Sequence, residues 1–375
     1  MAPVTQKRVV VTAFNPADPT ATLACVDAPV PVPREGEVLV RVTARPVNPA
    51  DVFSIMVRRC VRPRCAPHVR RALAHIDAPL RRQHLCACVR HSTAHQGVYP
   101  GFAPASLPAT PGLEGAGVVE ESNGTALAKG TRCVVFFNTR GGDGSWQEYV
   151  AVPATSCMPV PDSVSDEAAA QFLVNPVTVV GLLEELAVPP GEYVIQSAAG
   201  STLGRQLITL AKKQGIKTIN LVRRAEQAAE LKAIGADEVL CTETDDVVAR
   251  VTEITGGKLA WGAVDAVGGP LVARMSGAVR NCGTMLLYGA MSGLEFTGSI
   301  VDSLFRDVRI HGFWLNLYLG KLTPERKSAV FDAVVSWLAD GSLVPHSGEC
   351  FPLEKVVDAV KASQAPARNG KVLLK

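Results

Sequence analysis

Residues 193–223 constrain the fold of this chain more than any other stretch, because they contain two strand patterns separated by one helical pattern. An apolar run at 193–195 indicates a buried strand, and residues 218–222 indicate a second one. Between them, a Gly/Ser turn opens a segment whose Leu and Ala residues recur at helical spacing. The stretch therefore predicts a βαβ unit, in which a helix joins two parallel strands.

The turn of this unit contains Gly200, Ser201 and Gly204, and so lacks bulk where a phosphate would approach. A helix N-terminus presents free N–H groups and a partial positive charge, which suit a pyrophosphate. The spacing is not a strict GxGxxG, so these residues also fit a turn that only packs a helix on a sheet. Their position between two strands favours a dinucleotide site.

The end of the second strand indicates which dinucleotide binds. An NAD-selective unit usually carries an acid here that holds the ribose 2′-OH. This strand instead ends in Arg223 and Arg224, with no acid. Two guanidinium groups can clasp a 2′-phosphate in fork geometry, so NADPH is favoured over NADH. The alternative is that the arginine pair is only a solvated strand end.

The composition is that of an α/β protein with about two domains. The chain has 375 residues, of which 47% are hydrophobic and 19% charged. No apolar run reaches the ~18 residues of a membrane span, and the first residues, MAPVTQKRVVVTAF, show neither a secretory nor a mitochondrial leader pattern. These features favour a cytoplasmic protein without a membrane or nucleic-acid partner. Six scattered cysteines indicate small buried hydrophobes in a reducing compartment, namely Cys25, Cys133, Cys157, Cys241, Cys282 and Cys350.

The order of strand and helix patterns predicts two domains. Pro-rich turns separate strand patterns at 8–12, 37–43, 117–120, 131–137 and 146–152, with a helix start near Asn48, Pro49 and Asp51. A helical pattern capped by Ser163 or Ser165 follows. Later strand patterns lie at 238–242, 263–269, 283–290 and 308–315, and a helix at 324–338 precedes the ending GKVLLK. We expect a mostly-β domain from residues 1–164 and 316–375, and a doubly wound parallel sheet over 165–315.

Residues 57–96 differ in composition from the rest of the chain. These 40 residues hold nine Arg, one acid, five of the seven His and four of the ten Cys, but no Lys, Gly or aromatic residue. Their formal charge is +8, so the remainder carries −5 of the total of +3. The basic character of the protein therefore comes from this insert.

Three interpretations of the insert compete. A metal site is one, although the spacings are irregular and no CxxC occurs among Cys60, Cys65, His68, His84, Cys86 and Cys88. A basic arm for nucleic acid or membrane is the second, without aromatic residues for stacking. We favour the third, a retained intron, because Val57 and Gln96 can be encoded by codons that match splice junctions. Amplifying the transcript across this region tests it, and a product that always includes the insert would contradict it.

Several motifs carry a resemblance to a known family over essentially the full chain outside the insert. They are VNPADVFSI, QGVYPG, LPATPGLEGAGVV, VNPVTVVGLL, VIQSAAGSTLG, TINLVRR, AVGG, GTMLLYGAM and GFWL. On these motifs the chain resembles the medium-chain dehydrogenase/reductase superfamily, and within it the 2-enoyl thioester reductases of mitochondrial fatty acid synthesis. The resemblance implies a GroES-like catalytic domain discontinuous around a Rossmann domain, a mitochondrial location and a homodimer that pairs residues 308–315.

The resemblance also implies a zinc-free branch. Zinc alcohol dehydrogenases carry a His within a GHE triplet, whereas this chain has Gly112, Leu113 and Glu114 there and no Cys near residue 48. Without a Lewis acid, we expect hydride addition to an activated double bond rather than to a simple ketone.

The site residues implied by the resemblance surround an NADPH molecule. Tyr99 in the QGVYPG loop is the expected catalytic residue, placed to protonate Cα of a 2-enoyl thioester or to orient its enolate. The expected cofactor-binding residues are Asn175, Thr178, Gly200, Ser201, Thr202, Leu203, Gly204, Arg223, Arg224, Tyr288, Gly289, Met291, Phe313, Trp314, Leu315 and Lys371. From sequence alone, Phe313 and Trp314 also fit a core, Asn175 a helix cap and Lys371 a solvated surface. Thr202 departs from the family's turn, which predicts a reduced affinity.

The predicted function is NADPH-dependent reduction of trans-2-enoyl thioesters of CoA or acyl carrier protein. One alternative is a quinone or enone reductase of the same superfamily. The other is an inactive NADPH binder, because the insert lies directly before Tyr99. The sheet beyond the insert is expected to form regardless, since the entropy of loop closure grows slowly with length.

Overall fold

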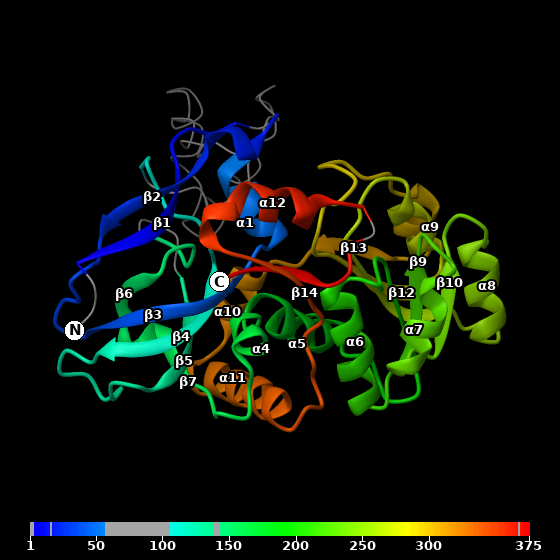
Figure 1. Cartoon of the computed structure of the whole chain (residues 1–375). Helices are drawn as coiled ribbons and strands as arrows, with labels where there is room; N and C mark the ends of the chain where they lie inside the picture. Colours follow the sequence, from blue (N-terminus) through cyan, green and yellow to red (C-terminus); the bar gives the residue numbers. More distant parts are fainter. Residues whose placement is uncertain (1–3, 16, 57–105, 138–142, 367) are drawn as a thin grey trace, which may run out of the picture.

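The computed structural model of the chain describes residues 4–15, 17–56, 106–137, 143–366 and 368–375. Within these ranges the protein has two large sheets and one two-stranded ribbon. Tyr99 and the insert at 57–96 lie outside the described residues. Figure 1 shows the two large sheets side by side, with the first and last parts of the chain together in one of them.

The six-stranded sheet is parallel throughout, in the order β10-β9-β8-β11-β12-β13. Its strands are β8 (Tyr193–Gln196), β9 (Lys217–Val222), β10 (Glu238–Cys241), β11 (Ala260–Asp265), β12 (Val279–Leu287) and β13 (Arg309–Gly312). The chain winds outward from β8 in both directions, so the strand order reverses between β8 and β11. In open α/β sheets, ligands bind outside the carboxyl ends of the strands at this point.

Helices connect and cover these parallel strands. They are α6 (Thr202–Lys213), α7 (Gln227–Ala233), α8 (Val247–Ile254) and α9 (Leu271–Gly277). The amphipathic α6 buries Leu203, Leu207 and Leu210 against the sheet. The predicted βαβ unit is therefore confirmed, as is the α/β fold class with a doubly wound parallel sheet.

The seven-stranded sheet combines the two ends of the chain. It consists of β3 (Glu37–Pro46), β4 (Glu114–Glu121), β5 (Arg132–Phe136), β6 (Tyr149–Pro153), β7 (Cys157–Pro159), β14 (Ser347–Phe351) and β15 (Lys371–Leu374). The ribbon of β1 (Thr5–Val11) and β2 (Leu23–Pro29) lies beside it. Because β15 pairs antiparallel with β3, the ending GKVLLK returns to the first part of the chain as predicted. The domain limits at 164 and 316 remain a prediction.

The remaining helices lie before and after the parallel sheet. They are α1 (Pro49–Met56), α4 (Asp166–Ala170), α5 (Val174–Leu186), α10 (Leu315–Lys321), α11 (Pro324–Ala339) and α12 (Val356–Gln364). Short 3₁₀ helices lie at Pro19–Thr22, Ala154–Ser156 and Leu353–Lys355, and a short π-helix lies at Val301–Phe305. The helical pattern predicted from 165 onward is thus two helices. Pro176 explains the break, since its ring excludes a continuous helix through Phe172.

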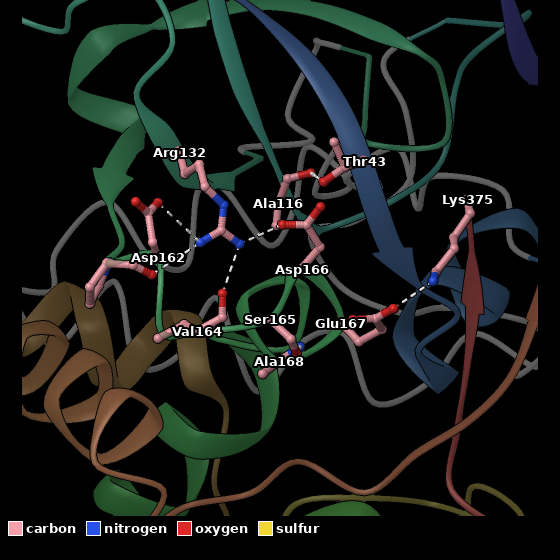
Figure 2. Close-up of polar contacts among 11 residues, drawn as sticks. Thr43, Ala116, Arg132, Asp162, Val164, Ser165, Asp166, Glu167, Ala168 and Lys375 are labelled. Atoms are coloured by element: carbon pink, nitrogen blue, oxygen red, sulfur yellow. Dashed lines mark hydrogen bonds and ion pairs between the residues drawn. The ribbon is translucent and has the colours of Figure 1, made fainter.

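Figure 2 shows how α4 is attached to the seven-stranded sheet. The guanidinium of Arg132 on β5 donates to the carbonyl of Val164 at 2.7 Å and to Asp166 at 2.6 Å. Ser165 accepts from the N–H of Ala168, which confirms it as the predicted cap. The short segment that leads into α5 is therefore held firmly against the sheet.

Candidate functional site

The turn between β8 and α6 brings the predicted phosphate-binding residues to the carboxyl edge of the parallel sheet. Ser201 caps α6, and its hydroxyl accepts from the N–H of Gly204 at 3.1 Å. A Cβ on Gly204 would lie 2.6 Å from the carbonyl oxygen of Ala199, so only glycine lets the helix pack this closely. Ala198 adopts φ +49°, a conformation that favours glycine and marks a sharp turn.

The other predicted residues of this turn differ in how strictly they are required. A Cβ on Gly200 would meet only the flexible end of Gln227, at 2.3 Å from its Nε2. Thr202 and Leu203 form the start of α6 and are buried. The side chain of Thr202 therefore packs against protein, and its expected effect on affinity remains a prediction.

A buried hydrogen-bond network centred on Gln196 connects the turn to the sheet. Nε2 of Gln196 donates to the carbonyl of Gly204 at 3.0 Å and to Oδ1 of Asn220 at 2.7 Å, which joins α6, β8 and β9. The apolar run that predicted the strand ends at residue 195, so it gave Gln196 no role. A polar residue directly after that run was the available signal.

Ser197 and Asp265 connect the ends of β8 and β11. The Ser197 hydroxyl donates to Asp265 at 2.5 Å, and the same carboxylate accepts from the N–H groups of Val267 and Gly268. Asp265 is fully buried, so these bonds set the shape of the loop that follows β11. The sequence motif AVDAVGG could have indicated this role of Asp265, because it places an acidic residue at the end of a buried strand.

The predicted 2′-phosphate ligands lie at the end of β9. Arg223 and Arg224 follow Val222 directly, and both are exposed. Within the described ranges neither guanidinium forms an ion pair. Because no acid in the described ranges pairs with these two adjacent guanidinium groups, their charge is available to a ligand.

Two predicted cofactor residues have buried polar atoms without a partner. Nδ2 of Asn175 and the hydroxyl of Tyr288 are enclosed and form no hydrogen bond with any residue that the structure describes. Burial raises the pKa of the Tyr288 phenol, so it is neutral and can donate. Unpaired buried donors are costly unless a ligand satisfies them, and these two fit a polar cofactor. Asn175 lies inside the first turn of α5 and is not its cap.

The remaining predicted cofactor residues occupy varied environments. Gly289 packs against the residue that follows β11, since its Cβ would lie 2.6 Å from the carbonyl oxygen of Ala266. Thr178 is buried on α5, whereas Met291 is 65% exposed. Trp314 is the N-cap of α10, and Leu315 is the first residue of that helix.

Phe313 belongs to the hydrophobic core. Its ring covers Gly181 of α5 and lies 5.7 Å from the ring of Tyr318. Phe313 is therefore surrounded by core residues, as one of the two interpretations of the sequence expected. A role of Phe313 beside the cofactor remains a prediction.

Lys371 is buried, being only 3% exposed, so the solvated-surface alternative was wrong. Its ammonium donates to Oδ1 of Asn48 at 2.7 Å, and Nδ2 of Asn48 donates to Glu114 at 2.9 Å. Asp51 lies beside them and accepts from the N–H groups of Asn48 and Leu113. We call Asn48, Asp51, Glu114 and Lys371 the buried charge cluster.

Burial shifts the ionisation of this cluster. It raises the pKa of Asp51 to about 7 and raises that of Glu114, because the charged forms lose water. It lowers the pKa of Lys371 to about 8, and the nearby Arg368 acts in the same direction. The sequence marked Asn48 and Asp51 only as a helix start, so the meeting of these four residues was missed.

Comparison with known proteins identifies the family. A model described as an alcohol dehydrogenase GroES-like domain matches residues 82–162, and one described as a zinc-binding dehydrogenase matches 202–338. The Enoyl-[acyl-carrier-protein] reductase, mitochondrial, of Caenorhabditis elegans is 32% identical over 256 residues, which cover 66% of this chain and 72% of that protein. The chain belongs to the enoyl-[acyl-carrier-protein] reductase family of the medium-chain dehydrogenase/reductase superfamily.

Solved structures share the fold of this family member. A quinone oxidoreductase of Pseudomonas syringae is 26% identical with a TM-score of 0.77, covering 98% of this chain and 99% of that one. A mycobacterial protein complexed with NADPH is 25% identical with a TM-score of 0.77 and the same coverage. The resemblance found in the motifs is therefore confirmed.

Two further observations concern the described ranges alone. No group of three or more His, Cys, Asp or Glu residues in them is arranged to hold a metal ion. None of their helices is both long and apolar enough to cross a bilayer. The Cys/His set of the insert lies outside the described residues.

Proposed function

We propose that this protein reduces the 2,3 double bond of trans-2-enoyl thioesters, carried by CoA or by acyl carrier protein, with NADPH. Membership of the enoyl-[acyl-carrier-protein] reductase family is the observation that carries this proposal. The site supports it, because a phosphate turn, an arginine pair and two buried donors without a partner among the described residues come from elements around the carboxyl edge of one sheet.

The residues present fit NADPH. The N-terminus of α6 at Ser201–Gly204 would hold the pyrophosphate, and Arg223 with Arg224 would hold the 2′-phosphate. Asn175 and Tyr288 would direct hydrogen bonds to the polar atoms of the nicotinamide part. When bound, NADPH supplies the hydride that reduces Cβ of the substrate.

Tyr99 is the proposed proton donor. Reduction at Cβ moves charge to the thioester oxygen, and Cα must then gain a proton. A phenol can supply that proton or orient the enolate. We expect Tyr99→Phe to lower kcat on crotonyl-CoA by about 10²- to 10⁴-fold, the range of general acid catalysis, while the Kd for NADPH stays near that of the wild type.

A matched pair of assays separates this proposal from its alternatives. Crotonyl-CoA and a quinone are each supplied with NADPH at equal protein concentration. Turnover of the thioester supports the proposal, whereas turnover of the quinone alone would replace it with the quinone reductase alternative, which the similarity to the Pseudomonas syringae structure favours. NADPH fluorescence enhancement without either activity would indicate an inactive binder, and deleting residues 57–96 tests whether the insert is the cause.

We also propose a homodimer formed through β13. This strand is the edge of the six-stranded sheet and pairs only with β12 among the described strands. Large exposed apolar side chains precede it, namely Met291, Leu294, Phe296, Ile300, Val301, Leu304 and Phe305. A second copy could extend the sheet and cover this surface. Sedimentation should give a dimer for the wild type and a monomer for Leu304→Glu with Phe305→Glu, and an unchanged dimer would contradict the model.

A mitochondrial role in fatty acid synthesis is the proposed setting, because the Caenorhabditis elegans relative is named as a mitochondrial enzyme. Fractionation of cells that express the native gene tests this location. Recovery in the cytosolic fraction would favour the cytoplasmic alternative.

A further inference from the structure

Glu114 links the seven-stranded sheet to helix α5. Its Oε2 accepts hydrogen bonds from the N–H of Leu173 at 2.7 Å and from that of Val174 at 2.9 Å, at the point where α5 begins. Its Oε1 accepts from Nδ2 of Asn48 at 2.9 Å. The side chain is 2% exposed, so water does not compete for these bonds.

The arrangement favours an ionised carboxylate, because all three contacts are donors and oppose the effect of burial, which raises the pKa of Glu114. Two positive partners favour that form. One is the partial positive charge of the α5 N-terminus. The other is the ammonium of Lys371, which the amide of Asn48 connects to Glu114. Asp51 is a second carboxylate in the cluster, but it contacts the N–H groups of Asn48 and Leu113 rather than α5.

The first turn of α5 carries the residues proposed to meet the cofactor. Asn175 directly follows Val174, whose N–H bonds to Glu114, and Thr178 lies one turn later. The amide Nδ2 of Asn175 is buried and has no hydrogen-bond partner among the residues that the structure describes. A small rotation of this turn would move that amide, and no hydrogen bond from Nδ2 to a described residue opposes the movement.

We propose that Glu114 is a positioning residue, whose carboxylate fixes the first turn of α5 and thereby aims the amide of Asn175 at the cofactor. The inference rests on the proposed function, in which Asn175 contacts NADPH. Glu114 itself touches neither the reacting atoms nor the cofactor in this role. It acts on the site through the backbone of Leu173 and Val174.

A double-mutant cycle on the full-length chain tests the inference, with the Kd for NADPH read by fluorescence enhancement. Glu114→Gln keeps the shape but loses the charge, and we expect about tenfold weaker binding from the loss of a charge-assisted acceptor. Combined with Asn175→Ala, it should bind no more weakly than Asn175→Ala alone, because both changes remove the same contact. Additive losses, or wild-type affinity in Glu114→Gln, would overturn the inference.

Asp51→Asn is the matched control. It removes a carboxylate of the same cluster that accepts from the backbone N–H groups of Asn48 and Leu113, neither of which belongs to α5. The losses of NADPH affinity caused by Asp51→Asn and Asn175→Ala should add in the double mutant. If Asp51→Asn couples to Asn175→Ala as strongly as Glu114→Gln does, any change in the cluster would disturb the site, and the specific role of Glu114 would be overturned. Should Glu114→Gln not fold, Glu114→Asp keeps the charge but is too short to reach both partners, and it should couple to Asn175→Ala in the same way.

Failure of this inference and failure of the proposed function are distinguishable. NADPH binding and crotonyl-CoA reduction are measured separately. A wild type that binds NADPH without reducing the thioester would end the proposed function, yet coupling between Glu114 and Asn175 would still be measurable. Absence of coupling in an active enoyl reductase would overturn only the inference.

Discussion

The ammonium of Lys371 donates a 2.7 Å hydrogen bond to Oδ1 of Asn48, although the two residues lie 323 positions apart in the chain. This bond decides how the amide of Asn48 is oriented, since Oδ1 is the end that accepts and Nδ2 is left to serve Glu114. One buried cation thus faces two buried carboxylates. The last strand of the chain thereby controls the electrostatics at the start of α1 and α5.

The buried charge cluster predicts a pH-dependent stability. The folded pKa of Asp51 is about 7, above the unfolded value near 3.9. Between these values the folded state keeps a proton that the unfolded state has lost, so the free energy of unfolding falls as pH rises through that window and levels off above pH 7. The size is on the order of 4 kcal/mol for this group. Urea denaturation from pH 4.5 to 8 measures how the free energy of unfolding depends on pH. Asp51→Asn should make this dependence flatter. An unchanged dependence would mean that other groups cause it.

Gly204→Ala tests the packing of the phosphate turn. The new Cβ would lie 2.6 Å from the carbonyl oxygen of Ala199 and 2.7 Å from its Cα, both backbone atoms that cannot move aside easily. We expect a loss of roughly 1–3 kcal/mol in the free energy of unfolding, as for other overpacked sites, together with weaker NADPH binding. Gly200→Ala is the milder comparison, because it meets only the end of Gln227. Equal effects of both changes would contradict the close approach at Gly204.

The arginine pair at the end of β9 should set cofactor preference. Replacing Arg223 and Arg224 with Gln removes the charge-assisted bonds proposed for the 2′-phosphate, each worth about 1.5–3 kcal/mol. The Kd for NADPH should rise at least tenfold, while that for NADH, which lacks the phosphate, should change little. Fluorescence titration of both cofactors checks this. A parallel loss of NADH affinity would mean that the arginines hold the turn itself.

Gly181 should be intolerant of a side chain because Phe313 covers it. A Cβ there would lie 2.6 Å from Cζ of Phe313 and 3.0 Å from Cδ1 of Tyr318. Gly181→Ala should therefore lower the free energy of unfolding by roughly 1–3 kcal/mol. Gly320 on α10 is the control, since its Cβ would meet nothing within 4 Å and Ala favours a helix by about 1 kcal/mol. Denaturation of the two variants should give opposite signs.

Tyr288→Phe should separate stability from binding. The hydroxyl is buried and has no partner in the described part of the chain, so its removal should raise the free energy of unfolding of the cofactor-free protein by about 1–3 kcal/mol. If the hydroxyl serves NADPH, the same change should weaken cofactor binding. Thermal denaturation and NADPH titration of one variant give both values. A variant that is more stable and binds NADPH as before would remove Tyr288 from the site.

Local patterns in the sequence predicted most of the fold. The run at 193–195, the turn and the strand at 218–222 appear as β8, the start of α6 and β9, and Ser165 caps α4 as expected. These elements follow from side-chain periodicity and capping, which act within a few residues. Pro176 was the exception, because its effect on Phe172 divided one expected helix into two.

The sequence by itself determined the βαβ unit, the arginine pair at its end and the family likeness, since each depends on residues that are neighbours in the chain. Only the tertiary structure decided the surroundings of Lys371, Phe313 and Glu114. Burial and hydrogen bonding depend on which distant segments meet, and β15 brings Lys371 to Asn48 while α5 brings its N–H groups to Glu114. The sequence alone does not distinguish a charged side chain in water from one buried beside a partner. The free energies of these two environments differ by several kcal/mol.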